Sequence, residues 1–195
     1  MTFFWNGNRS GYIDKNYEKY VELPSDKGIS FNQKPEMQAA LITDAVMANP
    51  EFDFARVNFA NGDMVGHTGD LPAAILAVEA VDHELGRLMS WSNSHGVTLL
   101  VTADHGNCDE MFDAKESDYP NWTYGAGSPA PKPKTAHTLA AVPMIIHPGG
   151  GRKIQLKQHL SNGTSFGLGN VANTVVQLLG LPPSDDFLEG LISDD

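Results

Sequence analysis

The strongest constraint on the fold is a long amphipathic segment that lies between two apolar runs. Residues 71–94 carry apolar side chains every three or four positions, which is the spacing of one helix face: Leu71, Ile75, Val78, Val81, Leu85 and Leu88. Asp70 is expected to cap this helix, with Pro72 in its first turn. The flanking runs 54–59 and 97–102 are predicted to be strands. Strand, helix and strand predict two parallel strands, a right-handed crossover and an α/β fold.

A polar motif follows each predicted strand. Asp63 and His67 lie within residues 58–70, and Asp104 and His105 lie within residues 102–107. Because the carboxyl ends of parallel strands share one edge of an open sheet, both motifs are expected to meet there, each on a strand-to-loop corner. Carboxylate oxygen and imidazole nitrogen are common ligands of divalent metals. Adjacent residues on an extended backbone point opposite ways, so Asp104 and His105 suit either two metals or a bridge between coordination shells.

His137 is a third candidate ligand. It follows a loop over residues 113–134 that is rich in glycine and proline, and it precedes a predicted strand over 142–147. If His137 joins the same site, that strand should run antiparallel, or the loop must span the sheet edge. The five side chains together favour a two-metal hydrolase or phosphotransferase, because paired metals stabilise both the attacking and the leaving oxygen.

The remaining pattern predicts one domain with a single core. A helix is expected over residues 35–48, and a strand over residues 2–5 opens the chain. Residues 14–35 are predicted to be loop, with a short helix near residues 16–20. A last helix over 167–179 is expected to turn five apolar residues inward: Leu168, Val171, Val175, Leu178 and Leu179. On the 71–94 helix the charged side chains are expected to face solvent: Glu79, Asp82, His83, Glu84 and Arg87.

Composition excludes several classes of partner. The 195 residues carry 24 acidic and 13 basic side chains, a net charge of −11, which argues against nucleic-acid or anionic-membrane binding. No apolar run approaches the roughly 20 residues that span a bilayer. The amino terminus has neither the basic region nor the long apolar region of a signal peptide. A single cysteine, Cys108, fits a reducing compartment, so a cytoplasmic location is expected.

Three motifs carry a family resemblance. Asn61-Gly-Asp-Met-Val-Gly-His-Thr-Gly69, Ala103-Asp-His-Gly-Asn107 and Ala136-His-Thr138 resemble the signatures of cofactor-independent phosphoglycerate mutase, an alkaline-phosphatase-superfamily enzyme. The resemblance implies a three-layer α/β/α fold with a mostly parallel sheet. It implies a glycolytic and gluconeogenic mutase that interconverts 3-phosphoglycerate and 2-phosphoglycerate through a phosphoserine. Asp63, His67 and His137 would then hold one metal, and Asp104 and His105 would contribute to a second. The expected metal is Mn²⁺, or Mg²⁺ or Co²⁺ in some members, without 2,3-bisphosphoglycerate.

The sequence also departs from this family. The family's nucleophilic serine, an aspartate of the second metal site and a transferase domain all lie upstream in a chain more than twice this length. Residues 1–195 therefore resemble the carboxyl-terminal part of the metal-binding domain, with the transferase domain absent. We expect the isolated chain to bind about one divalent ion and to lack mutase activity. We also expect the sheet to expose an edge through which molecules could associate.

Two other functions remain open from the sequence. One is a different phosphomonoesterase or phosphodiesterase of the alkaline phosphatase superfamily, although Ser10, Thr68 and Thr102 lie at unconvincing positions for a nucleophile. The other is a non-catalytic metal-binding module.

Overall fold

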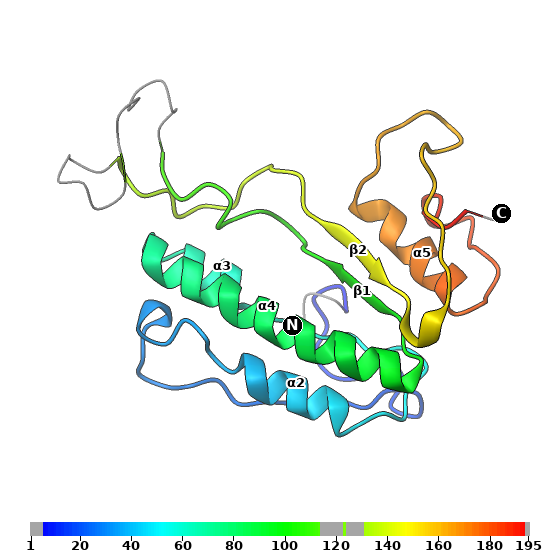
Figure 1. The fold of residues 1–195 in the computed structure, drawn as a ribbon, viewed down its shortest axis with the longest axis horizontal. Helices are drawn as coiled ribbons and strands as arrows, with labels where there is room; N and C mark the ends of the chain where they lie inside the picture. Colours follow the sequence, from blue (N-terminus) through cyan, green and yellow to red (C-terminus); the bar gives the residue numbers. More distant parts are fainter. Residues whose placement is uncertain (1–5, 114–122, 124–130, 194–195) are drawn as a thin grey trace.

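The computed structural model describes residues 6–113, 123 and 131–193, so the strand predicted over residues 2–5 lies outside the described part of the chain. Figure 1 shows a long helix, α4, between α2 on one side and a small sheet on the other, with α5 beyond that sheet. The elements in chain order are η1 (Phe31–Gln33), α2 (Ala39–Met47), α3 (Asn61–Gly66), α4 (Leu71–His95), β1 (Leu99–Thr102), β2 (Met144–His147), η3 (Gly149–Gly151), η4 (Leu168–Asn170) and α5 (Val171–Leu178).

Helix α4 forms where the sequence predicted it. Asp70 caps its amino terminus, since the Asp70 carboxylate accepts a hydrogen bond from the backbone nitrogen of Ala73 at 3.1 Å. The helix ends at Gly96, whose φ of +67° is the left-handed conformation that stops a helix at little steric cost. The predicted Asp70 cap, with Pro72 in the first turn, is therefore confirmed.

The buried face of α4 matches the predicted one only in part: Leu88 is buried and Leu71 packs against the core, as predicted, but the rest of the buried face differs. Ile75 and Val78 are each 50% exposed, whereas the buried residues are Ala73, Ala74, Ala77, Glu84, Leu88 and Ser92. Glu84, expected in solvent, is only 5% exposed. Its carboxylate pairs with Arg87 at 2.7 Å, and Arg87 also reaches Asp44 of α2 at 2.5 Å. This pairing offsets the desolvation of the buried charge, and it joins α4 to α2.

The sheet contains β1 and β2 in antiparallel register, with Leu99 opposite His147 and Thr102 opposite Met144. An antiparallel strand after His137 is one of the two arrangements that the sequence required for that residue to join the site. The predicted strand over residues 54–59 is wrong, because these residues adopt no strand conformation. Within the described ranges no strand pairs with them, and an extended segment forms a strand only when a neighbour supplies the ladder of hydrogen bonds. The parallel pair expected from this run is consequently not observed.

Of two other predicted helices, one starts later than expected and the other does not form. Residues 35–38 form turns, and Met37 has a φ of +47°, which a regular helix does not tolerate, so α2 begins at Ala39. The short helix expected near residues 16–20 is only a turn.

Helix α5 buries polar residues instead of the leucines predicted to face inward. Leu168 and Leu179 are exposed, while Asn173 and Thr174 are buried. Asn173 Nδ2 donates to the Ser184 carbonyl at 2.9 Å, and Thr174 Oγ1 accepts from the Leu191 backbone nitrogen at 2.9 Å. These side chains satisfy the backbone of the following segment, which therefore packs on the polar side of the helix.

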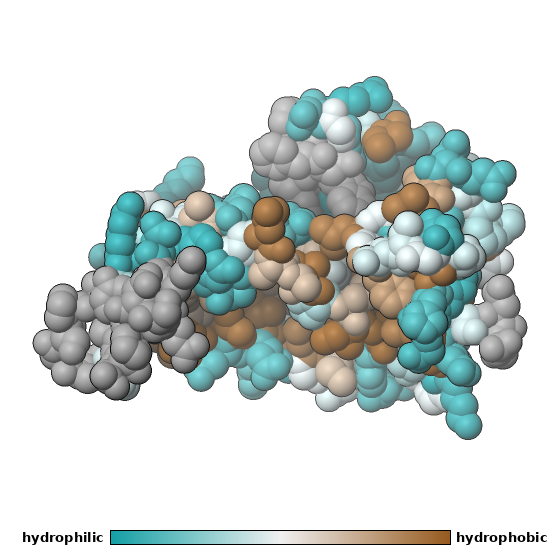
Figure 2. Space-filling view, turned by 90° about the horizontal axis from the view of Figure 1, so that it is seen from above, coloured by the Kyte–Doolittle hydropathy of each residue, from teal (hydrophilic) through white to brown (hydrophobic). Residues whose placement is uncertain are grey.

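The hydrophobic core is small, and much apolar surface remains open. One buried cluster joins α3, the first half of α4 and the segment after β1: Val65, Ala73, Ala74, Ala77 and Met111. Figure 2 shows apolar side chains gathered in a broad band on the face seen from above. Among the described residues, no helix is both long and apolar enough to cross a bilayer. The elements form an α/β arrangement in which the core holds α3 against α4.

The carboxylate of Glu189 predicts a pH-dependent contribution to stability. Hydrogen bonds from Lys157 and Ser161 lower the pKa of Glu189 from 4.5 to about 2. Ionised Glu189 therefore stabilises the folded chain above about pH 4.5, and this contribution is lost as the pH falls towards 2. Glu189→Gln should lower the melting temperature at pH 6 but not near pH 2. Glu51→Gln, at an exposed position, should leave it unchanged at both values. An equal effect of Glu189→Gln at both pH values would contradict the assignment.

Candidate metal centre

Asp63 and His67 lie on one face of α3. Asp63 is in its first turn and His67 is its C-cap, so the two side chains are four residues apart and project together. The predicted strand-to-loop corner for Asp63 and His67 is therefore wrong. The four-residue spacing itself was the available signal for a shared helix face.

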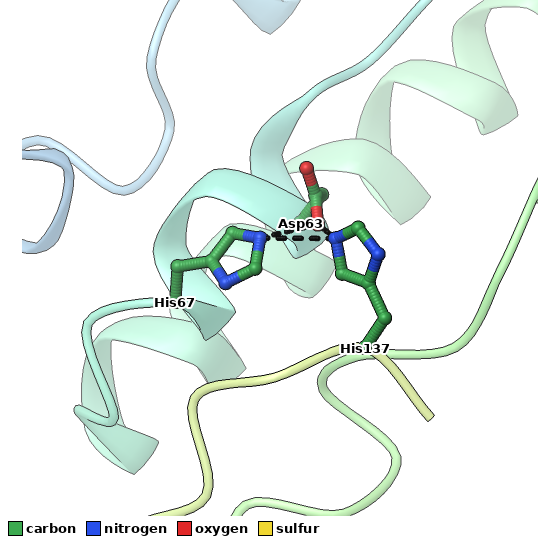
Figure 3. A group of neighbouring side chains, drawn as sticks. All are labelled: Asp63, His67 and His137. Atoms are coloured by element: carbon green, nitrogen blue, oxygen red, sulfur yellow. Dashed lines mark hydrogen bonds and ion pairs between the residues drawn. The ribbon is translucent and has the colours of Figure 1, made fainter. Parts of the chain in front are cut away.

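His137 completes a triangle of donor atoms with these two residues. His67 Nε2 and His137 Nε2 each lie 3.1 Å from Asp63 Oδ1, and the two nitrogens are 3.1 Å apart. Figure 3 shows the three side chains pointing towards one another, with Asp63 and His67 on α3 and His137 on the segment that leads to β2. A carboxylate and two imidazoles from separate parts of the chain thus converge on one point.

The ring orientation of His67 is fixed by a backbone carbonyl. His67 Nδ1 lies 2.6 Å from the carbonyl oxygen of Thr135, and because a carbonyl only accepts, Nδ1 must carry the proton. Neutral His67 therefore presents the lone pair of Nε2 to Asp63 Oδ1, which is also an acceptor. Two acceptor atoms 3.1 Å apart repel unless a cation lies beside both of them. The arrangement favours either a bound cation or a protonated ring.

The spacing fits a divalent ion. Neighbouring ligands of an ion with bonds of about 2.1 Å are about 3.0–3.4 Å apart in octahedral or tetrahedral coordination. The three donors, 3.1 Å from one another, match this range. Together they form a group of side chains that could hold a metal ion. Two nitrogens and one oxygen suit borderline metals such as Mn²⁺, Co²⁺ and Zn²⁺.

The second predicted pair lies beside this triangle. The His105 ring stacks on His137 with centroids 3.6 Å apart, and its Nε2 lies 4.0 Å from Asp63 Oδ1. Asp104 is 3.6 Å from His105 Nε2, but its side chain is 89% exposed. The two predicted motifs are therefore adjacent, as expected, with Asp104 at the solvent edge.

The segments that carry the donors approach closely because small residues separate them. A Cβ atom at Gly66 would lie 2.4 Å from Asn107 Oδ1, so a side chain at this position would have to displace the Asn107 amide. Residues 111–113 and 132–134 pair at the base of the predicted loop, since Asp113 N donates to Lys132 O at 2.8 Å. This pairing returns the chain to the site before His137.

Sequence reasoning missed two residues that contact the site. Asn107 donates from Nδ2 to Asp63 Oδ1 at 2.8 Å, and Cys108 donates from its thiol to the Gly62 carbonyl at 2.8 Å. Burial raises the pKa of the Cys108 thiol, and the negative charges of Asp109 and Asp63 add to the effect. Cys108 therefore remains a neutral donor that holds α3, not a thiolate ligand. Asn107 lies inside the second motif, but its role depends on a contact that only the fold creates.

Comparison with known proteins places the chain in a family. A family model described as the metalloenzyme superfamily matches residues 1–183. The chain belongs to the metalloenzyme superfamily. This membership, with the structural match below, confirms the predicted α/β, alkaline-phosphatase-like fold.

Several proteins named phosphoglycerate mutase are similar to this chain. "Probable 2,3-bisphosphoglycerate-independent phosphoglycerate mutase" of Leptospira interrogans is 44% identical over 200 residues, which cover 100% of this chain and 35% of that protein. The 2,3-bisphosphoglycerate-independent phosphoglycerate mutase of Trypanosoma brucei brucei is 41% identical over 98% of this chain and 34% of its own length. A crystal structure of Leishmania mexicana phosphoglycerate mutase at low cobalt concentration matches with a TM-score of 0.86 and 41% identity, over 100% of this chain and 35% of that one. The resemblance seen in the motifs is confirmed, and the chain spans about a third of the length of these relatives.

Two glycines of α3 give a matched test of the packing around the site. Gly66→Ala places a methyl group against Asn107 and should destabilise the chain by about 1–3 kcal/mol. Gly62→Ala meets nothing within 4 Å and should be neutral or stabilising by up to about 1 kcal/mol, because alanine favours the helix. Urea unfolding of both variants without metal measures the difference, and equal effects would contradict the close approach at Gly66.

Proposed function

We propose that this chain is the metal-binding part of a cofactor-independent phosphoglycerate mutase, and that Asp63, His67 and His137 hold one divalent ion. The observation that carries the proposal is the triangle of donors 3.1 Å apart, in which the lone pair of His67 faces a carboxylate oxygen. Membership of a metalloenzyme superfamily and relatives that are named phosphoglycerate mutases support the same function.

A divalent ion at this site would supply positive charge for binding and polarising phosphate oxygens. The chain's own residues would orient it: Thr135 holds the His67 ring, and stacking of His105 restricts the His137 ring. We further propose that His105 and Asp104 contribute to a second ion next to the first. Their positions beside Asp63 support this, and the exposure of Asp104 leaves its carboxylate free to turn towards an ion.

The substrate and the cofactor are part of the proposal. The names of the relatives point to 3- and 2-phosphoglycerate, small anions that a metal can bind in spite of the net charge of −11. Mn²⁺ is the proposed ion, with Co²⁺ and Mg²⁺ as substitutes.

We propose that residues 1–195 form one metal-binding unit. We also propose that the sheet edges of β1 and β2 allow molecules to associate, and that the site works in the cytoplasm.

The ligand set is tested by metal affinity. Asp63→Ala and His137→Ala should each weaken Mn²⁺ binding by more than about 100-fold, because each removes one of three donors. His159→Ala, at an exposed histidine, should bind as the unaltered chain does. Isothermal titration calorimetry on all four proteins measures the dissociation constants. Undiminished binding by both site variants would rule out this ligand set.

Turnover by the isolated chain is a separate test. We expect the purified 195-residue protein, loaded with Mn²⁺, to bind the ion without converting 3-phosphoglycerate, because the proposal assigns the nucleophile to another part of the mutase. An enolase-coupled assay measures the conversion, and a generic phosphomonoester measures phosphatase activity in parallel. Robust mutase turnover would overturn the expectation, and hydrolysis of the phosphomonoester alone would favour the phosphatase alternative.

A further inference from the structure

We propose that the turn Gly106–Asp109 is a clip that positions two of the metal ligands without binding the ion itself. One arm holds Asp63 on α3, and the other holds the residue next to His137. This inference rests on the proposed function of Asp63, His67 and His137 as ligands. It assigns positioning roles to Asn107, Asp109 and Thr138.

The first arm is the side chain of Asn107. Its Nδ2 donates to Asp63 Oδ1 at 2.8 Å and to the Asp63 backbone carbonyl at 3.1 Å. Both partners are acceptors, so the amide nitrogen, and not the amide oxygen, must face Asp63. The oxygen that receives this hydrogen bond is the same Oδ1 that faces both imidazoles. Asn107 therefore fixes which carboxylate oxygen points into the site.

The environment of Asn107 indicates a role beyond packing. Asn107 is 6% exposed, and its Oδ1 is buried without a hydrogen-bond partner among the described residues. A buried carbonyl without a partner destabilises a fold, so an apolar side chain of similar shape would be expected if the position served packing alone. The absence of a side chain at Gly66 makes room for this oxygen. The hydrogen bonds that the Asn107 amide nitrogen donates to Asp63 explain why an amide occupies this position.

The second arm joins Asp109 to Thr138. Thr138 Oγ1 donates to Asp109 Oδ2 at 2.7 Å, and Thr138 N donates to the Gly106 carbonyl at 2.9 Å. A Cβ atom at Gly106 would lie 2.2 Å from Thr138 Oγ1, so the two segments are in direct contact. Thr138 is buried, whereas the neighbouring His137 is about half exposed. The buried threonine therefore anchors the backbone beside a ligand whose own side chain is half exposed.

The two arms join α3 to the segment that carries His137. Residues 106–109 contact both from one turn, so the separation of Asp63 and His137 is set by the protein before an ion arrives. Outer contacts of this kind orient the ligands of metal sites, and their removal commonly weakens metal binding by about 10–100-fold.

The test compares isosteric and conservative variants in each arm. Thr138→Val removes the hydroxyl donor and keeps the shape, while Thr138→Ser keeps the donor. Asp109→Ala removes the acceptor, while Asp109→Asn keeps one. Asn107→Ala removes the first arm. For each protein we would measure the Mn²⁺ dissociation constant by calorimetry, the visible absorption of bound Co²⁺, and the melting temperature without metal.

We expect Asn107→Ala, Thr138→Val and Asp109→Ala to weaken Mn²⁺ binding by about 10–100-fold and to change the Co²⁺ spectrum. Thr138→Ser and Asp109→Asn should restore most of the affinity. A lower melting temperature with unchanged affinity and spectrum would show a merely structural turn and overturn the clip. Should Asn107→Ala fail to fold, the Thr138 pair alone decides. Failure of the unaltered chain to bind Mn²⁺ would overturn the proposed function together with the clip, whereas binding that no variant alters overturns the clip alone.

Discussion

The contact between Asp63 Oδ1 and the two imidazole nitrogens is the interaction around which this part of the molecule is built. The Nε2 lone pair of a neutral His67 ring repels Asp63 Oδ1 at 3.1 Å unless a cation or a ring proton lies between them, so the fold must hold the two side chains together from outside. It does so with the Thr135 carbonyl behind His67 and the Asn107 amide behind Asp63. A cation at the centre removes the repulsion, and its binding is therefore coupled to the stability of the folded chain.

The sequence predicted which residues form this site, but not the contacts that bring them together. Asp63, His67 and His137 do converge, and Asp104 with His105 does lie beside them. The predicted cause of this proximity is a pair of parallel strands. Residues 54–59, predicted to form one strand of that pair, form no strand. Proximity comes instead from the packing of the 106–109 turn on α3. Periodicity identifies elements, but it does not reveal a contact that a side-chain amide makes with a residue 44 positions earlier.

Helix α4 shows the same contrast: its ends depend on neighbouring residues in the sequence, whereas its buried face depends on contacts with distant elements. The boundaries of α4 were predictable because its cap, its proline and its terminal glycine act on their own backbone. The buried face of α4 was not predictable in the same way, because it depends on which elements cover the helix. Apolar spacing favoured the side with Ile75 and Val78, yet α2 and α3 cover the side with three alanines and Glu84. Arg87, three residues further along α4, offsets the buried charge of Glu84, and Asp44 of α2 holds the Arg87 guanidinium through a contact that the local sequence does not encode.

Figure 2 shows an apolar band on the face seen from above. Large exposed apolar side chains outside the candidate metal centre include Ile75 and Val78 on α4 and Leu179 directly after α5. The donors and the clip come from α3, the turn after β1 and the segment before β2. In the described part of the chain, the side-chain hydrogen bonds of Asp63, His67 and Thr138 all go to partners within residues 62–140. The geometry of the three donors therefore depends on contacts already made within this chain, and covering the apolar band would change its exposure without changing the partners of Asp63.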